Sequence, residues 1–321
     1  MPESNLPYSV TAPSGAFTIK PHSISKRLQL VTLSAAAVTA FKSVCENWGI
    51  QTLEYKPFLR FAIANALDAS CGHKLGETLI GIIKDRNTGA FILEYEGQAD
   101  SVVENEEAIA EFNVKLSTAV SHLLGLSNFD SMGGKYYARF SVKNLDSSDS
   151  YLRQAHRRME LHNDGTFVDE RTDYVLMMKM AEKNMEGGNS LILHVDDWQD
   201  LPEFLQDPVA TQDIEWSAPP SKQVQGKVYH PVFFETDANG LPHMLFIDQF
   251  AAPKNIQQGL YLHKMGDSLE AEKNCLSVPV PVGSMLVMHN HRWLHGRDQF
   301  AANPGLEREL LRQRGHFTEQ N

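Results

Sequence analysis

The sequence predicts an α+β protein with a mainly β core, arranged as a sandwich or jelly roll that is backed by helices. Two observations lead to this prediction. Apolar residues recur at helical spacing through much of the first 124 residues, and short apolar segments separated by Pro, Gly and Asp follow from about Lys135. Helices followed by many short strands are typical of a sheet-on-sheet core with helices on an outer face.

The N-terminal part of the chain predicts a helical layer behind a short extended segment. Residues 1–25 are rich in Pro, Ser and Thr and are expected to form an extended arm. From Leu33 to Ala69 the apolar spacing is helical, with Trp48-Gly49 separating two helices. The clearest helix runs from Glu104 to Leu124, and Gly125 stands where a C-cap glycine is expected.

The rest of the chain predicts strands interrupted by helical insertions. Strands are expected at residues 136–142, 174–180, 190–193, 228–234, 244–247, 284–288 and 310–317. The insertions are expected at residues 196–204 and 255–270. Because no segment repeats at a regular period, residues 1–321 are expected to form a single domain.

The composition is that of an ordinary globular protein and restricts its partners. Of 321 residues, 42% are hydrophobic and 21% are charged. The formal net charge of −11 argues against nucleic acid or an anionic membrane, because both require a basic surface. Cys45, Cys71 and Cys275 show no CxxC spacing, which favours a reducing cytoplasm over a disulfide framework or zinc cluster. No targeting or membrane-spanning segment is expected.

Two tripeptides of the form H-x-D are candidates for a metal site. In His194-Val195-Asp196 the acid precedes a helical stretch, so an N-cap role for Asp196 explains it. His162-Asn163-Asp164 lies in a polar stretch, and Asp164-Gly165 predicts a tight turn that directs both side chains to one ion. On spacing alone, the alternative that His162 and Asp164 are ordinary loop residues remains open.

A second imidazole must come from further along the chain. His289, His291 and His295 are the candidates, and His295 is favoured because Trp293 and Leu294 shield it and Gly296 permits a turn. Two His and one Asp are the set that binds one face of a non-haem Fe(II), which leaves positions for oxygen and an oxidant.

Three arginines follow the distal imidazole. Arg308, Arg312 and Arg314 share one parity and point to one side of a strand. A solvated surface or salt-bridge row is one reading. The other is a buried strand face that binds dicarboxylates bidentately, with Arg297, Arg139 and Lys143 as weaker candidates.

The chain resembles the Fe(II)/2-oxoglutarate-dependent dioxygenases of the taurine dioxygenase and clavaminate synthase group. Within that group it is similar to the carbon-starvation-induced glutarate 2-hydroxylases. The segments that carry the resemblance include Gly187–Ser190, Ser127–Asp130, Tyr136–Phe140, Ser150–Gln154, Tyr174–Lys179 and Trp293–Asp298. The resemblance implies a double-stranded β-helix with flanking helices, an Fe(II) centre, 2-oxoglutarate as co-substrate and O2 as oxidant.

The resemblance also implies the reaction and the roles of single residues. The expected activity is hydroxylation of glutarate at C2 in lysine catabolism, with succinate and CO2 as co-products, by a homotetramer. His162, Asp164 and His295 match the metal ligands. Ser190 matches a position that touches 2-oxoglutarate. Arg308 and Arg312 match paired arginines of which one binds the distal carboxylate of 2-oxoglutarate, and Arg314 is an additional candidate.

Two rival functions follow from the same residues. One keeps the fold but changes the substrate to another small acid, amine or sulfonate, and the arginine cluster favours anions. The other is a non-enzymatic β-sandwich binding protein in which the His and Asp residues are structural.

Overall fold

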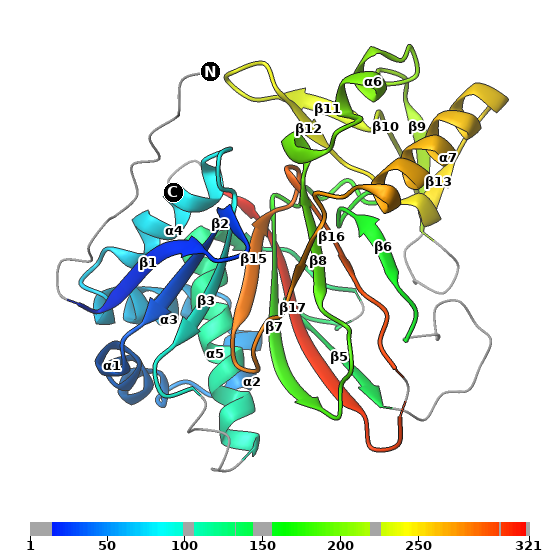
Figure 1. The fold of residues 1–321 in the computed structure, drawn as a ribbon. Coiled ribbons are helices and arrows are strands. Elements are labelled where there is room, and N and C mark those ends of the chain that lie inside the picture. The colour runs from blue at the N-terminus through cyan, green and yellow to red at the C-terminus, as the bar shows by residue number, and fades with distance from the viewer. Residues whose placement is uncertain are drawn as a thin grey trace.

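A computed structural model of the chain describes residues 15–98, 106–131, 133–143, 156–218, 226–301 and 303–318. Two β-sheets form its centre, a helical layer covers one side, and a smaller α/β region lies at one end (Figure 1). No helix within these residues combines the length and apolar character needed to cross a membrane. The expected mixture of helices with a mainly β core is therefore confirmed.

The larger sheet has eight strands. Its order is β1 (Phe17–His22), β2 (Ser25–Leu33), β3 (Ala90–Tyr95), β15 (Met285–His289), β7 (Tyr174–Lys183), β17 (Glu307–Phe317) and β4 (Gly125–Ser127), and β5 (Ala138–Lys143) also pairs with β17. Only the β2–β3 pair is parallel among these pairings. The mainly antiparallel pattern brings the C-terminal strand β17 against β7, in the middle of the molecule (Figure 1).

The smaller sheet has four antiparallel strands. Its order is β14 (Leu276–Val278), β8 (Ser190–His194), β16 (Trp293–Arg297) and β6 (Met159–His162). Alternate residues of its strands face opposite ways. Leu193 and Leu294 join an apolar cluster on one face, whereas Ile192 joins a different cluster with Leu286 and Met288 of the larger sheet. The second cluster therefore packs one sheet onto the other.

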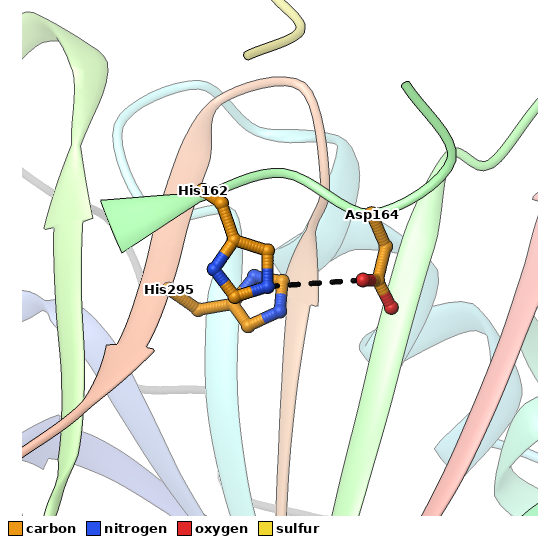
Figure 2. A group of neighbouring side chains, drawn as sticks. All are labelled: His162, Asp164 and His295. Carbon is orange, nitrogen blue, oxygen red and sulfur yellow. Dashed lines mark ion pairs between the residues drawn. The ribbon is translucent and has the colours of Figure 1, made fainter. Parts of the chain in front are cut away.

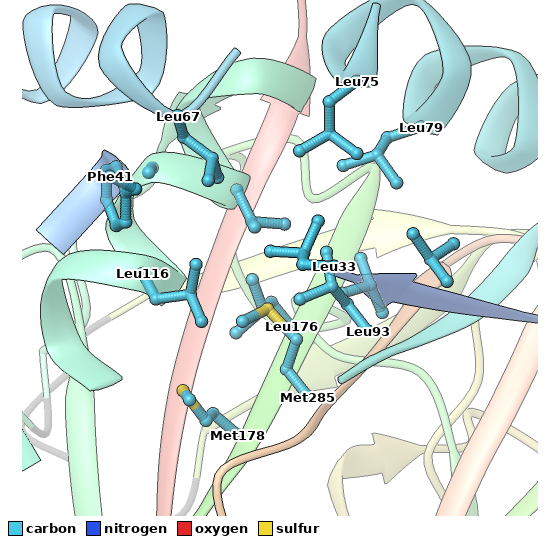
Figure 3. Close-up of a cluster of buried hydrophobic side chains, with 14 of the residues drawn as sticks. Leu33, Phe41, Leu67, Leu75, Leu79, Leu93, Leu116, Leu176, Met178 and Met285 are labelled. Carbon is cyan, nitrogen blue, oxygen red and sulfur yellow. The ribbon is translucent and has the colours of Figure 1, made fainter. Parts of the chain in front are cut away.

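Five helices back the larger sheet. They are α1 (Ala35–Cys45), α2 (Ile50–Tyr55), α3 (Phe58–Ser70), α4 (Leu75–Lys84) and α5 (Glu106–Leu124). Figure 3 shows Phe41, Leu67 and Leu116 from this layer meeting Leu176 and Met178 of β7. These side chains are almost fully buried, and burial of each large apolar side chain contributes about 1.5–3 kcal/mol.

A peripheral region completes the fold. It contains the strands β9 (Ile214–Ser217), β10 (Lys227–His230), β11 (Phe233–Thr236), β12 (Pro242–Met244) and β13 (Ala251–Ala252), and the helices α6 (Leu201–Gln206) and α7 (Ile256–Ala271). Short 3-10 turns occupy Val195–Asp197 and Asp248–Phe250. This region packs through Trp216, Phe246 and Met265 onto the outer face of the smaller sheet.

The structure confirms some of the predicted helices and differs from the prediction at others. The helix expected to end at Leu124 is confirmed as α5, with Glu104 outside the described residues. The insertion at 255–270 is confirmed as α7, and that at 196–204 is a 3-10 turn followed by α6. Residues 33–69 form the end of β2 and three helices rather than two helices. Helix α4 was not predicted from the apolar pattern.

The strand predictions were less accurate at their ends. Residues 228–234 form two strands rather than one, because Pro231 between them has no backbone N–H for a sheet ladder. The strand expected at 244–247 is wrong, since β12 ends at Met244. Residues 17–22 of the expected arm form β1, and residues 1–14 lie outside the described residues. The strands that were not predicted also include β2, β3, β4, β6, β9, β13, β14 and β16.

Gly125 does not act as a C-cap glycine. It begins strand β4, and a Cβ atom there would lie 2.1 Å from the carbonyl oxygen of His316 on β17. Close approach of two strands, rather than a left-handed cap, requires glycine at this position.

Candidate metal centre

Three side chains converge between the two sheets. His162 is the last residue of β6, and His295 lies directly opposite it on β16. Their ring centroids are 4.3 Å apart, and His162 Nε2 lies 3.9 Å from Asp164 Oδ1 (Figure 2). One ligand atom from each residue falls within 4.8 Å of the others, and no other such group of three occurs among the described residues.

Two asparagines hold the backbone beside this group. The side chain of Asn290 accepts a hydrogen bond from Asp164 N and donates one to Asp164 O, both at 2.9 Å. The side chain of Asn163 donates to the carbonyl oxygens of Asn290 and Trp293. Gly165 then turns the chain away with φ of +84°, which glycine adopts readily. The ligand-bearing segment is thereby fixed to the start of β16.

The electrostatics of the group favour a bound cation. Burial alone would raise the pKa of Asp164, but Arg312 and Arg314 outweigh it and hold that pKa well below its usual range. Burial and the neighbouring His162 lower the pKa of His295 to about 3. At neutral pH the group therefore offers an ionised carboxylate and a neutral imidazole from His295. The Nδ1–H of His162 donates to the Glu160 carbonyl oxygen at 2.8 Å, which directs Nε2 toward the other two residues.

The donor set fits a non-haem Fe(II) ion. His295 Nδ1 is a buried atom without a hydrogen-bond partner among the described residues, whereas Asp164 Oδ2 is in ion-pair contact with Arg312. A buried polar group without a partner costs about 1–3 kcal/mol, so the His295 ring calls for a ligand. Two imidazoles and one carboxylate are the protein ligands of Fe(II) oxygenases that leave coordination positions free.

The three arginines of β17 are all held away from bulk solvent. Arg312 Nη1 lies 3.2 Å from Asp164 Oδ2, and Arg312 Nη2 donates to Asp130 Oδ2 at 2.9 Å. Arg314 Nη2 is 3.5 Å from the same Asp130 oxygen. Arg308 is 6% exposed and its Nε has no hydrogen-bond partner. The reading of these residues as a solvated surface is therefore wrong, whereas the salt bridges of the same reading are present for Arg312 and Arg314.

Ser190 and Arg297 lie at the Arg308 end of the site. Ser190 begins β8 and stands directly opposite Arg297 in the pairing with β16. Burial and the nearby guanidinium of Arg308 lower the pKa of Arg297 to about 10. A pair of like charges in a buried place binds an anion well. Among the weaker candidates, Arg139 instead pairs with Glu309, and the side chain of Lys143 lies outside the described residues.

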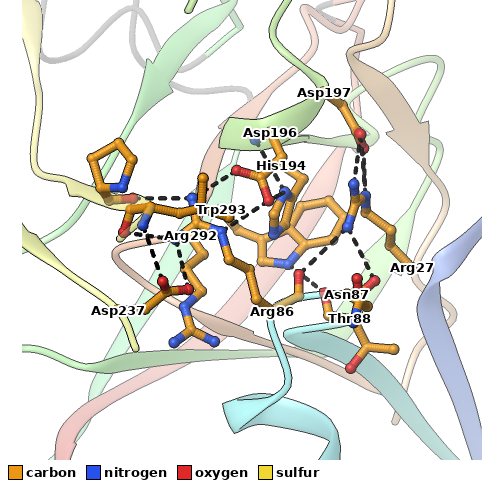
Figure 4. A network of polar contacts seen from close by, with 12 residues as sticks. Arg27, Arg86, Asn87, Thr88, His194, Asp196, Asp197, Asp237, Arg292 and Trp293 are labelled. Atoms are coloured by element: carbon orange, nitrogen blue, oxygen red, sulfur yellow. Dashed lines mark hydrogen bonds and ion pairs between the residues drawn. The ribbon is translucent and has the colours of Figure 1, made fainter. Parts of the chain in front are cut away.

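The second H-x-D pair belongs to a structural network. His194 Nδ1 accepts a hydrogen bond from Asp196 N, so His194 and not Asp196 caps the 3-10 turn. The carboxylate of Asp196 binds the buried Arg86 through two hydrogen bonds of 2.6 and 2.9 Å (Figure 4). The same network joins Arg27 to Asp197. The N-cap prediction for Asp196 is wrong, although its structural role is confirmed.

The rejected imidazoles also lie elsewhere. His289 and His291 cluster with His243, with ring centroids 5.4–5.9 Å apart. Gly296 does not form the expected turn, because it lies inside β16, where a Cβ would come within 2.5 Å of Met159 O. Sequence reasoning missed the roles of Asn290 and Asp130, although Asp130 stood in a segment that carried the family resemblance.

Comparisons with known proteins agree with this geometry. The CsiD family model matches residues 17–317. The chain is 53% identical over 311 residues to the glutarate 2-hydroxylase of Klebsiella pneumoniae (strain 342), covering 97% of this chain and 94% of that protein. It is 53% identical over 309 residues to the protein of the same name from Citrobacter koseri, covering 96% and 93%.

Solved structures of oxygenases share the fold. An asparagine oxygenase in complex with Fe(II), 2S,3S-3-hydroxyasparagine and succinate has a TM-score of 0.70 and 17% identity, over 89% of this chain and 92% of that one. The non-haem iron oxygenase OrfP in complex with Fe and alpha-ketoglutaric acid has a TM-score of 0.63 and 14% identity, over 88% and 92%. At such identities the likeness concerns the fold alone. The family match and the relatives at 53% identity together show that the chain belongs to the CsiD family.

Proposed function

We propose that the chain is an Fe(II)/2-oxoglutarate-dependent glutarate 2-hydroxylase. It converts glutarate, 2-oxoglutarate and O2 into 2-hydroxyglutarate, succinate and CO2, in the catabolism of lysine. The observation that carries the proposal is the group His162, Asp164 and His295 beside arginines whose Nε atoms are buried without a hydrogen-bond partner among the described residues. The glutarate 2-hydroxylases at 53% identity, matched over nearly their whole length, support it.

His162, Asp164 and His295 hold the iron in this proposal. A bound Fe(II) supplies the redox chemistry that couples decarboxylation of the oxo acid to hydroxylation of a C–H bond. The chain contributes a fixed ligand set, because Asn163 and Asn290 hold the backbone on both sides of it. It also contributes a water-poor setting between the sheets, where Arg312 keeps Asp164 ionised.

Different arginines of β17 bind the two organic acids in this proposal. Arg308 and Arg312 are four residues apart, about 13 Å along an extended strand. Arg312 touches Asp164 and therefore lies next to the iron site. We assign the distal carboxylate of 2-oxoglutarate to Arg308 and Ser190, with Arg297 beside them. We assign a carboxylate of glutarate to Arg312 and Arg314.

The remaining expectations are proposals of the same kind. The two facing sheets support a double-stranded β-helix, and the core shared by the helices and the larger sheet supports one domain. The three free thiols support a location in the reducing cytoplasm.

An exposed apolar surface on α2 and α3, where Tyr55 is 83% and Phe58 67% exposed, supports a subunit interface in a homotetramer. Measurement of the molar mass in solution tests the tetramer.

The reaction is tested with the purified chain loaded anaerobically with Fe(II). Addition of 2-oxoglutarate should develop a weak visible charge-transfer band, and O2 should then release succinate in proportion to the glutarate consumed. A panel of other small carboxylates and sulfonates tests the substrate. If the charge-transfer band develops but succinate is released faster with another acid than with glutarate, the chain is a 2-oxoglutarate-dependent oxygenase whose substrate is not glutarate. Absence of both the band and succinate would reject the whole proposal.

A further inference from the structure

The carboxylate of Asp130 links the two arginines nearest the metal group. Asp130 follows β4 and is 2% exposed. Its Oδ2 accepts a hydrogen bond from Arg312 Nη2 at 2.9 Å and lies 3.5 Å from Arg314 Nη2. The backbone around it closes on itself, since Asp130 N donates to Lys135 O at 2.7 Å. A single buried acid therefore contacts both guanidiniums, while the other terminal nitrogen of Arg312 contacts Asp164.

The two arginines need such a partner. They stand two residues apart on the same face of β17, so their like charges repel within a buried space. The Nε atoms of both arginines are buried without a hydrogen-bond partner among the described residues. Arg312 and Arg314, which both contact Asp130, therefore each keep an unused N–H donor for a ligand.

The charges around Arg312 and Arg314 indicate which kind of ligand these two arginines bind. Two guanidiniums face Asp130 and Asp164. When Asp164 ligates a divalent ion, its negative charge is shared with that ion and Asp130 is the only full counter-charge left among these four residues. One positive charge then remains for one further carboxylate.

We propose that Asp130 is a positioning residue for the organic acid substrate, because its carboxylate aligns Arg312 and Arg314 so that the pair binds one substrate carboxylate. The inference rests on the proposed function and names a residue beyond the metal ligands and the arginines. Asp130 touches the two arginines and acts through them.

The test is Asp130→Asn in the full chain, which keeps the shape of the side chain and removes its charge. The KM for glutarate should rise about tenfold to a hundredfold, as expected when charge-assisted hydrogen bonds lose alignment. The KM for 2-oxoglutarate in uncoupled turnover without glutarate should stay within about twofold, because Arg308 and Ser190 are unchanged. In the metal-free protein, glutarate should no longer raise the midpoint of thermal unfolding. Asp130→Glu should recover part of the glutarate affinity.

Glu309→Gln is the matched control. Glu309 lies on β17 and its carboxylate pairs with Arg139 of the neighbouring strand β5. The substitution therefore also removes a carboxylate that pairs with an arginine, but not one that contacts Arg312 or Arg314. It should leave both KM values unchanged. The proposal is overturned if Asp130→Asn binds glutarate like the wild type, or if it loses glutarate and 2-oxoglutarate affinity equally. Failure of the proposed function looks different, since the wild-type protein itself would then show no glutarate-dependent succinate release.

Discussion

His162 and His295 occupy directly opposite positions on β6 and β16, with their ring centroids 4.3 Å apart. The pairing of two strands, far apart in the sequence, therefore decides whether both imidazoles reach one ion. A slip of one residue would turn one of them to the other face of the sheet. Because Asp164 follows two residues after His162, the same pairing also places the carboxylate.

Gly296→Ala should disturb this pairing. A Cβ at Gly296 would lie 2.5 Å from Met159 O and 3.1 Å from Glu160 O, so β6 must move away. Overpacking of this kind destabilises a protein by about 1–3 kcal/mol. We also expect iron affinity to fall about tenfold to a hundredfold, as when the groups that orient a metal ligand are lost. Urea unfolding and iron titration measure the two effects.

Gly81→Ala provides the comparison for that variant. Gly81 lies inside α4, and a Cβ there meets nothing within 4 Å. This substitution should stabilise the protein by about 0.5–1 kcal/mol, because alanine favours a helix over glycine. Equal iron affinity of Gly296→Ala and the wild type would contradict the role assigned to the β6–β16 pairing.

Asp164→Ala should abolish iron binding. Loss of one of three protein ligands removes the only carboxylate of the group, and we expect iron affinity to fall by more than about a hundredfold. Asp196→Ala, in the other H-x-D tripeptide, should keep its iron. That variant should instead lose about 1.5–3 kcal/mol of stability, because it removes charged hydrogen bonds to Arg86. Iron content after desalting and thermal unfolding distinguish the two variants, and a reversed pattern would contradict the assignment.

The sequence predicted the three residues of the candidate metal group better than the strands that carry them. His162 and Asp164 were assigned by residue type and spacing, whereas β6, on which His162 lies, was not predicted. Only four residues form that strand, too few to show a period. Its existence depends on pairing with β16, more than a hundred residues later in the chain. Parity likewise predicted that the arginines of β17 share one face, because it depends only on local extended geometry.

Tertiary partners explain what the sequence could not predict. Gly125 and Gly296 were read as a cap and a turn, but a neighbouring carbonyl oxygen requires glycine at each position. Asp196 was read as an N-cap, and its carboxylate instead binds Arg86, 110 residues earlier. The importance of Asp130 depends on two arginines near the other end of the chain. No local pattern records contacts of this range.

Arg308→Gln should weaken 2-oxoglutarate binding more than glutarate binding. If Arg308 holds the distal carboxylate, the substitution removes a buried charged donor and raises the KM for 2-oxoglutarate about tenfold to a hundredfold. Ser190→Ala should have a smaller effect, about fivefold, because a neutral hydrogen bond contributes about 1 kcal/mol. Arg314→Gln should show the opposite preference and mainly raise the KM for glutarate. Steady-state kinetics with each acid varied separately would disprove the assignment if Arg308→Gln affected only glutarate.

Acid should destabilise the fold through its buried histidines. Burial lowers the pKa of His122 to about 4, and burial with nearby Arg292 lowers that of His243 to about 4. An unfolded histidine has a pKa of about 6.5, so between about pH 6.5 and 4 the unfolded chain binds more protons than the folded one. The stability from each neutral histidine is therefore present above about pH 6.5 and is lost as the pH falls toward 4, by up to about 1.4 kcal/mol per pH unit.

Urea unfolding at pH 7, 6 and 5 should show this decline in the free energy of unfolding. His122→Gln should reduce its slope, whereas Gln257→Ala, at an exposed position of α7, should not. A slope identical in all three proteins would show that protonation of His122 does not limit stability in acid.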